Sequence, residues 1–131
     1  MLKKKFPLPK FPPSVSVTFR SVCQELPLES LPELRTELNN FVNAVLSDPA
    51  TKADLNSLRS LYDRALFLLD VYPDRTNKEQ SLIIGAIRYF AAAKDSLPEI
   101  IFSTRFNDDI QVMNHVLEEL GLESRSIELS S

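Results

Sequence analysis

The stretch from Ser81 to Leu120 constrains the fold of this chain more than any other part of it. Its first segment, Leu82–Ala93, is apolar on nearly every side, and Arg88 is its only charged residue. Because a helix that is apolar all round must pack against several neighbours, we expect a central helix over about residues 77–94. A proline-closed turn follows this helix. A second helix is then expected over 108–120, where Gly121 predicts its end.

Composition favours helices over sheets in the rest of the chain. The 131 residues include only two glycines and no tryptophan, whereas tight hairpins usually need residues that accept a positive φ. Apolar residues three and four positions apart predict helices at 31–46 and 48–71. The spacing of Thr76 and Glu79 is that of a capping box and predicts the start of the central helix. We therefore expect an all-α, compact single-domain bundle of about five helices.

Residues 14–26 are compatible with two structures. Val15, Val17 and Phe19 alternate as in a strand, but apolar residues in this segment also recur at helical spacing. We choose a helix that Pro27 ends, because a lone strand would have no partner elsewhere in the chain. The expected organisation is a Pro/Lys-rich arm at 1–13, a helical domain at 14–121 and a polar tail at 122–131 that frays.

The charge balance separates a basic arm from an acidic body. Lys3, Lys4, Lys5 and Lys10 give the first ten residues a charge of +4, and because the net charge is −3 the remaining 121 residues carry −7. An acidic body argues against nucleic acid as the main partner. The four lysines could touch an anionic surface such as a membrane, and the plainer interpretation is a solvated tail.

Several classes of protein are excluded by what the sequence lacks. Cys23 is the only cysteine, so an internal disulfide and a cysteine-based zinc site are impossible, and a reducing compartment fits. Neither glycine lies in a phosphate-binding loop, which excludes dinucleotide and P-loop sites. The longest apolar run is too short to span a bilayer, and the proline-broken start is a poor signal peptide. We expect a cytoplasmic protein.

The sharpest candidate site consists of three carboxylates, Asp95, Asp108 and Asp109. If the connector between the two helices folds back, their oxygens would converge, and three or four such oxygens suit Mg²⁺ or Ca²⁺. The simpler interpretation is helix capping, because an aspartate at a first turn faces the positive end of the helix dipole. Our expectation is therefore no cofactor, with a divalent cation as the alternative.

Arg88 bears on the same question. It lies within the apolar helix, and an unpaired buried guanidinium would be very costly. Asp95 is the first candidate partner, and Asp108 is another. Such an ion pair would be structural and would compete directly with a cation.

No residue is assigned a catalytic role. His115 is the only histidine, and a catalytic histidine needs both an orienting partner and a nucleophile. No serine or cysteine here lies in a recognised nucleophile setting. We expect His115 to be a partly exposed structural residue and Cys23 to be a small packing residue.

The central stretch resembles the YkvA-like domain, a family of small helical bacterial domains with no agreed activity. The resemblance rests on Tyr89-Phe90, on the turn Asp95-Ser96-Leu97-Pro98 and on Asp108-Asp109, which follow one another at the family's intervals over residues 81–120. It implies a helical fold and an acidic turn that acts as one unit. It implies no catalytic residues, because the family has none established.

The chain departs from the family's pattern around that turn. Ala93 stands near the place of a family proline, Glu99 stands where the family has an aspartate, and the connector 100–106 has no glycine. The resemblance therefore does not define the shape of the connector.

Three functions are compatible with these observations. The leading one is a non-enzymatic helical domain that contacts a protein partner or forms a homo-oligomer through its arm and an exposed apolar stripe. The second is a divalent-cation-dependent enzyme that uses the acidic cluster. The third is a peripheral membrane binder that uses the lysine arm.

Overall fold

The structure, a computed structural model, describes residues 13–47, 55–92 and 106–127. Within these ranges the chain forms five α-helices and three short 3-10 helices, and no strand. The α-helices are α1 (Pro13–Val22), α2 (Leu31–Ser47), α3 (Leu55–Val71), α4 (Asn77–Ala92) and α6 (Phe106–Glu119). The 3-10 helices are η1 (Leu28–Ser30), η2 (Tyr72–Asp74) and η3 (Glu123–Arg125). The prediction of an all-α fold with about five helices is confirmed.

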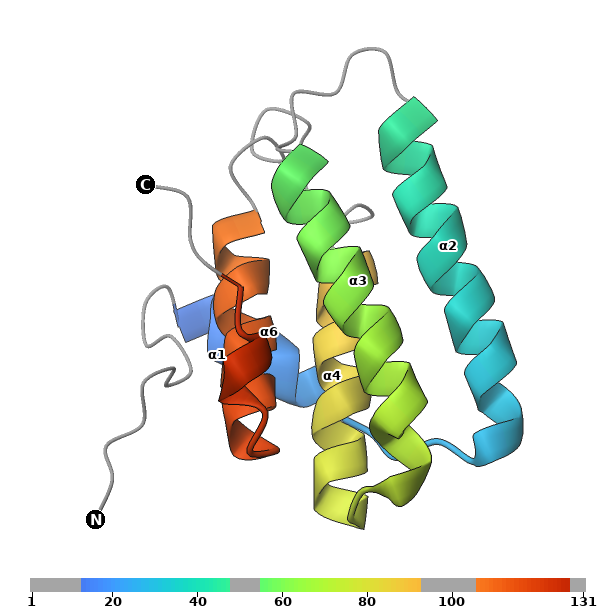
Figure 1. The fold of residues 1–131 in the computed structure, drawn as a ribbon, viewed down its shortest axis with the longest axis vertical. Coiled ribbons are helices and arrows are strands. Elements are labelled where there is room, and N and C mark those ends of the chain that lie inside the picture. The colour runs from blue at the N-terminus through green and yellow to red at the C-terminus, as the bar shows by residue number, and fades with distance from the viewer. Residues whose placement is uncertain (1–12, 48–54, 93–105, 128–131) are drawn as a thin grey trace.

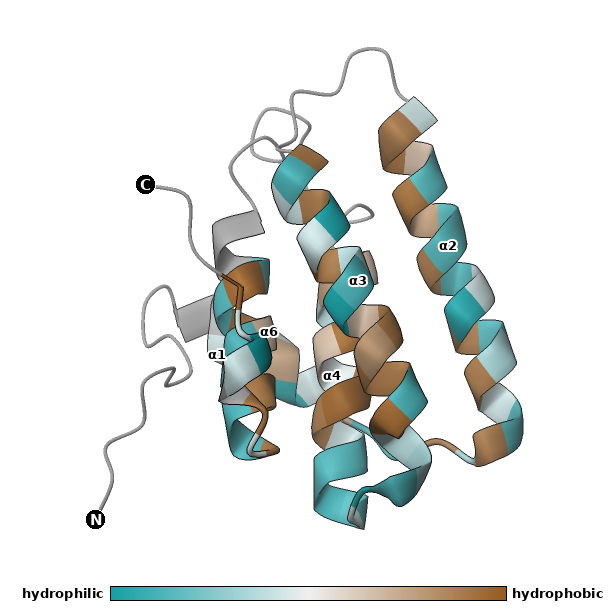
Figure 2. Ribbon diagram, viewed as in Figure 1, coloured by the Kyte–Doolittle hydropathy of each residue, from teal (hydrophilic) through white to brown (hydrophobic). Residues whose placement is uncertain are grey.

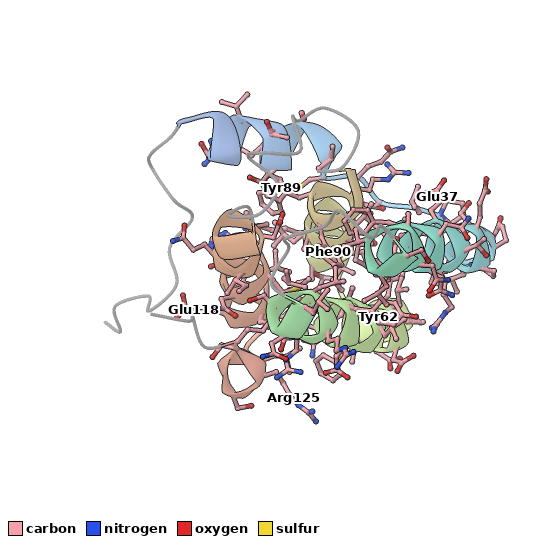
Figure 3. All side chains as sticks on the ribbon, turned by 90° about the horizontal axis from the view of Figure 1, so that it is seen from above. Glu37, Tyr62, Tyr89, Phe90, Glu118 and Arg125 are labelled. Atoms are coloured by element: carbon pink, nitrogen blue, oxygen red, sulfur yellow. The ribbon has the colours of Figure 1, made fainter. Side chains whose placement is uncertain are left out.

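Helix α4 is the centre of the bundle, as its all-round apolar character predicts. It contacts each of the other four α-helices, and the view from above shows them arranged around it (Figure 3). The helices α2, α3, α4 and α6 run alternately up and down, while α1 lies across them (Figure 1). As a result the end of α2, the start of α3, the end of α4 and the start of α6 all lie at the same end of the molecule.

The core is made by the apolar stripes that helical spacing predicts. Figure 2 shows apolar residues on the inner faces of the helices and polar residues outside. Burying one Leu or Ile side chain contributes about 1.5–3 kcal/mol relative to leaving it exposed. All five α-helices and η2 contribute to the largest fully buried side chains, and α1 and α2 supply one each: Phe19, Leu38, Leu58, Leu61, Leu68, Tyr72, Ile83, Ile84, Ile87, Phe90, Ile110 and Met113.

The ambiguous segment at 14–26 forms a helix, but α1 ends at Val22, four residues before the predicted end. Tyr72 holds Leu26, at the end of the predicted segment, outside the helix. The backbone N–H of Leu26 donates to the Tyr72 hydroxyl at 2.8 Å, and that hydroxyl donates to the carbonyl of Leu26 at 2.6 Å. Because both main-chain groups of Leu26 are bonded to one side chain, this residue cannot take part in a helical ladder.

A glycine on α4 lets α1 approach closely. A Cβ atom on Gly85 would lie 2.3 Å from the sulfur of Cys23 and 2.9 Å from Cε1 of Phe19. Both distances are shorter than real contacts of Cβ atoms, so a larger residue fits there only if the Cys23 and Phe19 side chains, or the backbone that carries them, shift. The absence of a side chain at Gly85 thus permits the close packing of Phe19 and Cys23 on α4.

The predicted start of α4 and end of α6 are also confirmed. Thr76 and Glu79 form the reciprocal capping box, with the backbone N–H of each donating to the other's side chain at 3.2 Å.

At the end of α6, Gly121 has a φ of 75°. The backbone N–H of Leu122 donates to the carbonyl of Leu117 at 2.7 Å, and that of Gly121 donates to Glu118 at 3.0 Å. These two bonds are a Schellman motif.

The segment after α6 does not fray over its described part. We call residues 122–127 the C-terminal strap. It contains η3, folds back along α6 and ends at Ile127, whose side chain is buried in the core. The expected polar tail is therefore packed on the body as far as Ile127. The predicted helix start at Asp48 and the last predicted residues of the central helix lie outside the described residues.

Candidate functional site

The structure describes part of the predicted acidic site. Asp109 lies near the start of α6, and its side chain is only 2% exposed. Asp108 belongs to the first turn of the same helix, but its side chain lies outside the described part of the structure, as does the whole of Asp95. The meeting of the three carboxylates thus stays a prediction. A buried carboxylate in a first helical turn has the position that suits the helix dipole.

Arg88 has a partner other than an aspartate. Its side chain is half-buried on α4, and Nη1 donates to the side-chain oxygen of Gln24 at 3.1 Å. Gln24 follows α1, so this bond joins the segment after α1 to the central helix. The predicted ion pair with Asp95 lies outside the described residues and remains untested. The same holds for the arm lysines Lys3, Lys4, Lys5 and Lys10.

His115 and Cys23 occupy packing positions around α1. The His115 ring is half-buried and meets the Phe19 ring edge to face, with centroids 6.2 Å apart. Cys23 is half-buried against Gly85. Burial raises the pKa of the Cys23 thiol above its ordinary value of 9.0, and the nearby charge of Arg20 lowers it in part. A thiol with a raised pKa is a poor nucleophile at neutral pH.

Two tyrosine hydroxyls tie segments of the fold together. The Tyr62 hydroxyl donates to the side-chain oxygen of Asn39 at 2.5 Å and joins α3 to α2. The Tyr72 hydroxyl holds Leu26, as described above. Arg75 makes a third contact between segments, because its Nη1 donates to the carbonyl of Leu120, directly after α6, at 3.1 Å. These polar side chains hold helices and connecting segments of the bundle to one another.

Two exposed leucines belong to helix ends at the same end of the bundle. Leu46 near the end of α2 is 45% exposed, and Leu55, the first residue of α3, is 40% exposed. The two antiparallel helices are in contact, and both residues belong to the helix ends at the top of Figure 1. We call Leu46 and Leu55 the α2–α3 tip. Leu28 in η1 is 54% exposed at the opposite end.

Asn114 binds the C-terminal strap, a contact that the sequence did not predict. The Asn114 side chain, buried on α6, donates from Nδ2 to the carbonyl of Ile127 at 2.8 Å and accepts from its N–H at 2.7 Å. The available signal was a polar residue between the core residues Met113 and Val116. A buried amide needs hydrogen-bond partners, but periodicity alone could not show that the partner is the main chain of a segment thirteen residues later.

The described residues contain no group of three or more His, Cys, Asp or Glu side chains placed to hold a metal ion. In the same part of the chain, no helix is long and apolar enough to cross a membrane. Comparisons with protein-family models, with curated proteins and with solved structures gave no match to this sequence.

Proposed function

We propose that this protein is a non-enzymatic helical domain that acts through contacts with another protein or with a second copy of itself. The α2–α3 tip is the observation that carries the proposal. Leu46 and Leu55 place two large apolar side chains, each about half exposed, at one end of a hairpin. Contiguous exposed apolar patches are typical of protein interaction surfaces, and these two leucines come from helix ends at the same end of the bundle.

The polar residues of the bundle support the same proposal. Asn114, Tyr72 and Arg75 bind main-chain groups, and their bonds hold the strap, the segment after α1 and the end of α6. Side chains used in this way stabilise the scaffold. The tip, in contrast, is an apolar surface that the described residues leave in contact with solvent.

The test uses charged substitutions that suit the helix dipoles. Leu46→Lys places a cation at the end of α2, and Leu55→Glu places an anion at the start of α3, so each change is compatible with its helix. We expect wild type to show concentration-dependent association in sedimentation velocity, or to retain a partner, and the double variant to lose it. Leu28→Glu is the matched control, because it charges a leucine at the opposite end that is somewhat more exposed than Leu46 and Leu55.

Two outcomes would overturn the proposal. One is a wild type that stays monomeric at every concentration and retains no protein that the double variant loses. The other is an equal loss of association in the Leu28→Glu control. Circular dichroism of each variant establishes that the fold is intact.

Membership of the YkvA-like family and a cytoplasmic location are parts of the same proposal. The order of the helices supports the first. Tyr89 and Phe90 lie near the end of α4 and Asp109 near the start of α6, and these helices contact each other. A divalent-cation-dependent enzyme that uses Asp95, Asp108 and Asp109 is the alternative proposal, and binding to a membrane surface through the lysine arm is another.

A further inference from the structure

The first 24 residues of the chain contain no acidic residue, although the whole chain has 18. Four lysines and Arg20 give this segment a charge of +5, and because the net charge is −3 the remaining 107 residues carry −8. The described part of the segment is α1 with the two residues that follow it. Among the described α-helices, only α1 has a basic residue and no acidic one.

One side of α1 faces away from the bundle. Figure 3 shows α1, in blue, at the outside of the molecule, with the other helices all on one side of it. The Phe19 side chain is buried, whereas Val17, Arg20 and Ser21 are exposed. These three residues share a helix face, because they are three and four positions apart. Val17 is 66% exposed, more than any other large apolar side chain in the described residues. We call Val17, Arg20 and Ser21 the outer face of α1.

Two arginines near the end of α1 have no acidic partner. The Arg20 charge acts on the Cys23 thiol, and Arg88 reaches the next residue, Gln24, from α4. Neither arginine forms an ion pair in the described part of the structure. The Arg20 guanidinium is exposed and donates no hydrogen bond there, so its N–H groups are open to a ligand. Carboxylates are the protein groups that pair best with such donors.

We propose that the outer face of α1 docks an acidic segment of a partner protein, whose carboxylates pair with Arg20 and whose apolar atoms contact Val17. This inference rests on the proposed action through protein contacts and names the chemistry of one partner. Charge complementarity supports it, because a basic face on an otherwise acidic protein directs an acidic partner to one place. The other described α-helices all carry acidic side chains, which disfavour the same partner.

The composition of this face favours a protein over an anionic lipid surface. Helices that lie on lipid surfaces carry several cations and bury large side chains such as Trp, Phe and Leu. The outer face of α1 has one valine and one arginine, with a serine beside them. So small a set of contacts suits a short acidic segment.

Binding of a fluorescein-labelled oligoglutamate peptide to the 131-residue chain tests the proposal, with fluorescence anisotropy as the readout. We expect wild type to bind the peptide more weakly as the salt concentration rises. Arg20→Glu should weaken binding at least about tenfold. Arg59→Glu is the matched control, because it makes the same charge change at an exposed arginine of α3 that forms no ion pair in the described residues. This control should stay within about twofold of wild type.

The Cys23 thiol provides a second readout in wild type. The Arg20 charge lowers the pKa of this thiol, so a carboxylate bound to Arg20 should raise the pKa again. Saturating peptide is therefore expected to slow alkylation of Cys23 by iodoacetamide at least about twofold. The alkylation rate of Arg20→Gln should not respond to the peptide. This second readout decides if circular dichroism shows that Arg20→Glu fails to fold.

Three outcomes would overturn the proposal: no binding of the peptide, equal weakening by Arg20→Glu and Arg59→Glu, or an alkylation rate that bound peptide leaves unchanged. Vesicles of phosphatidylcholine and phosphatidylserine form a further arm of the experiment. Binding to these vesicles without binding to the peptide would assign the face to lipid and overturn the proposal as well. In each case, wild type that still associates through Leu46 and Leu55 would leave the proposed function standing.

Discussion

Asn114 illustrates how one buried polar residue organises a segment that would otherwise be free. Its side-chain oxygen accepts from the Ile127 N–H and its NH₂ group donates to the Ile127 carbonyl. These two bonds hold the strap against the core, in which the Ile127 side chain is buried. Because the bonds are made to backbone groups, the side chain at position 127 contributes only by its burial. The side chain at position 114 contributes its hydrogen bonds. The two roles can be separated by substitution.

Asn114→Ala is expected to lower the free energy of unfolding by about 1–3 kcal/mol, because the N–H and carbonyl of Ile127 lose their partners in a buried place. Urea denaturation measures the change. The matched control is Asn43→Ala, the same substitution at an exposed position of α2, which should stay within about 0.5 kcal/mol of wild type. Equal effects of the two substitutions would contradict a structural role for the Asn114 amide.

The Cys23 thiol provides a second prediction at this scale. Burial raises its pKa above 9.0, and Arg20 lowers it in part. We expect iodoacetamide to alkylate Cys23 with a pH midpoint above 9.0, and Arg20→Gln to move this midpoint higher because the lowering charge is lost. Faster alkylation in Arg20→Gln than in wild type would show that the charge has the opposite effect.

The same raised pKa has a consequence for stability. The folded state binds the thiol proton more tightly than the unfolded state, so this contribution is complete below the unfolded pKa. It is lost as the pH rises through the folded pKa, which means above about 9 for this group. A Cys23→Ala variant should lack this part of the pH dependence.

At the scale of elements, the crossing of α1 and α4 depends on the absence of a side chain at Gly85. Intrinsic helix propensity alone would predict that Gly85→Ala stabilises α4 by about 1 kcal/mol. We expect the opposite, a loss of about 1–3 kcal/mol from overpacking, because the new methyl group would meet Cys23 and Phe19. Denaturation in urea measures the effect, and a stabilised Gly85→Ala variant would refute the close approach.

A double-mutant cycle identifies the contact responsible. In a Cys23→Ala background the sulfur at 2.3 Å is removed, while the Phe19 ring at 2.9 Å remains. The penalty of Gly85→Ala should therefore shrink without vanishing.

The junction between α6 and the strap depends on the backbone of Gly121. Its φ of 75° is left-handed, and nothing lies within 4 Å of the position that a Cβ would take. The effect of substitution is thus conformational and not steric. Gly121→Ala should cost about 1–2 kcal/mol, measured as a lower melting temperature, whereas Gly121→Asn should cost less because asparagine tolerates this conformation. Identical losses in both variants would point to another cause.

The predictable parts of the fold are those that depend on neighbours in sequence. Thr76 with Glu79, Gly121 at the end of α6 and the apolar stripes of α2 and α3 all follow from spacing, and all agree with the structure. Two features depended on distant partners. Leu26 is held outside α1 by Tyr72, which lies 46 residues later in the chain, and the strap is held by α3 and α6. A polar residue among core residues, such as Asn114, signals that a partner is needed, but the spacing of residues does not show which distant group that partner is.

At the scale of the whole molecule, alternating helix directions bring four helix termini to one end of the bundle (Figure 1). Leu46, Leu55 and Asp109 come from three of these termini. The sequence predicted Asp109 as part of a site, since paired aspartates at a helix start are visible in a sequence. It did not predict the exposed tip, because Leu46 and Leu55 lie in the same helical pattern as buried leucines and only their position at the helix ends leaves them in solvent.

The behaviour of the protein with divalent cations decides between the leading proposal and its enzymatic alternative. Asp109 is 2% exposed, so its oxygens present no open position to an entering ion unless the start of α6 moves. We therefore expect Mg²⁺, Mn²⁺ and Ca²⁺ to leave the melting temperature unchanged. Asp109→Asn should melt earlier, because a buried group near the start of α6 is altered. A cation present at about one hundred times its dissociation constant would add roughly 2.7 kcal/mol, which is several degrees for a domain of this size. A shift in wild type that both Asp95→Asn and Asp108→Asn abolish would make the acidic turn a metal site.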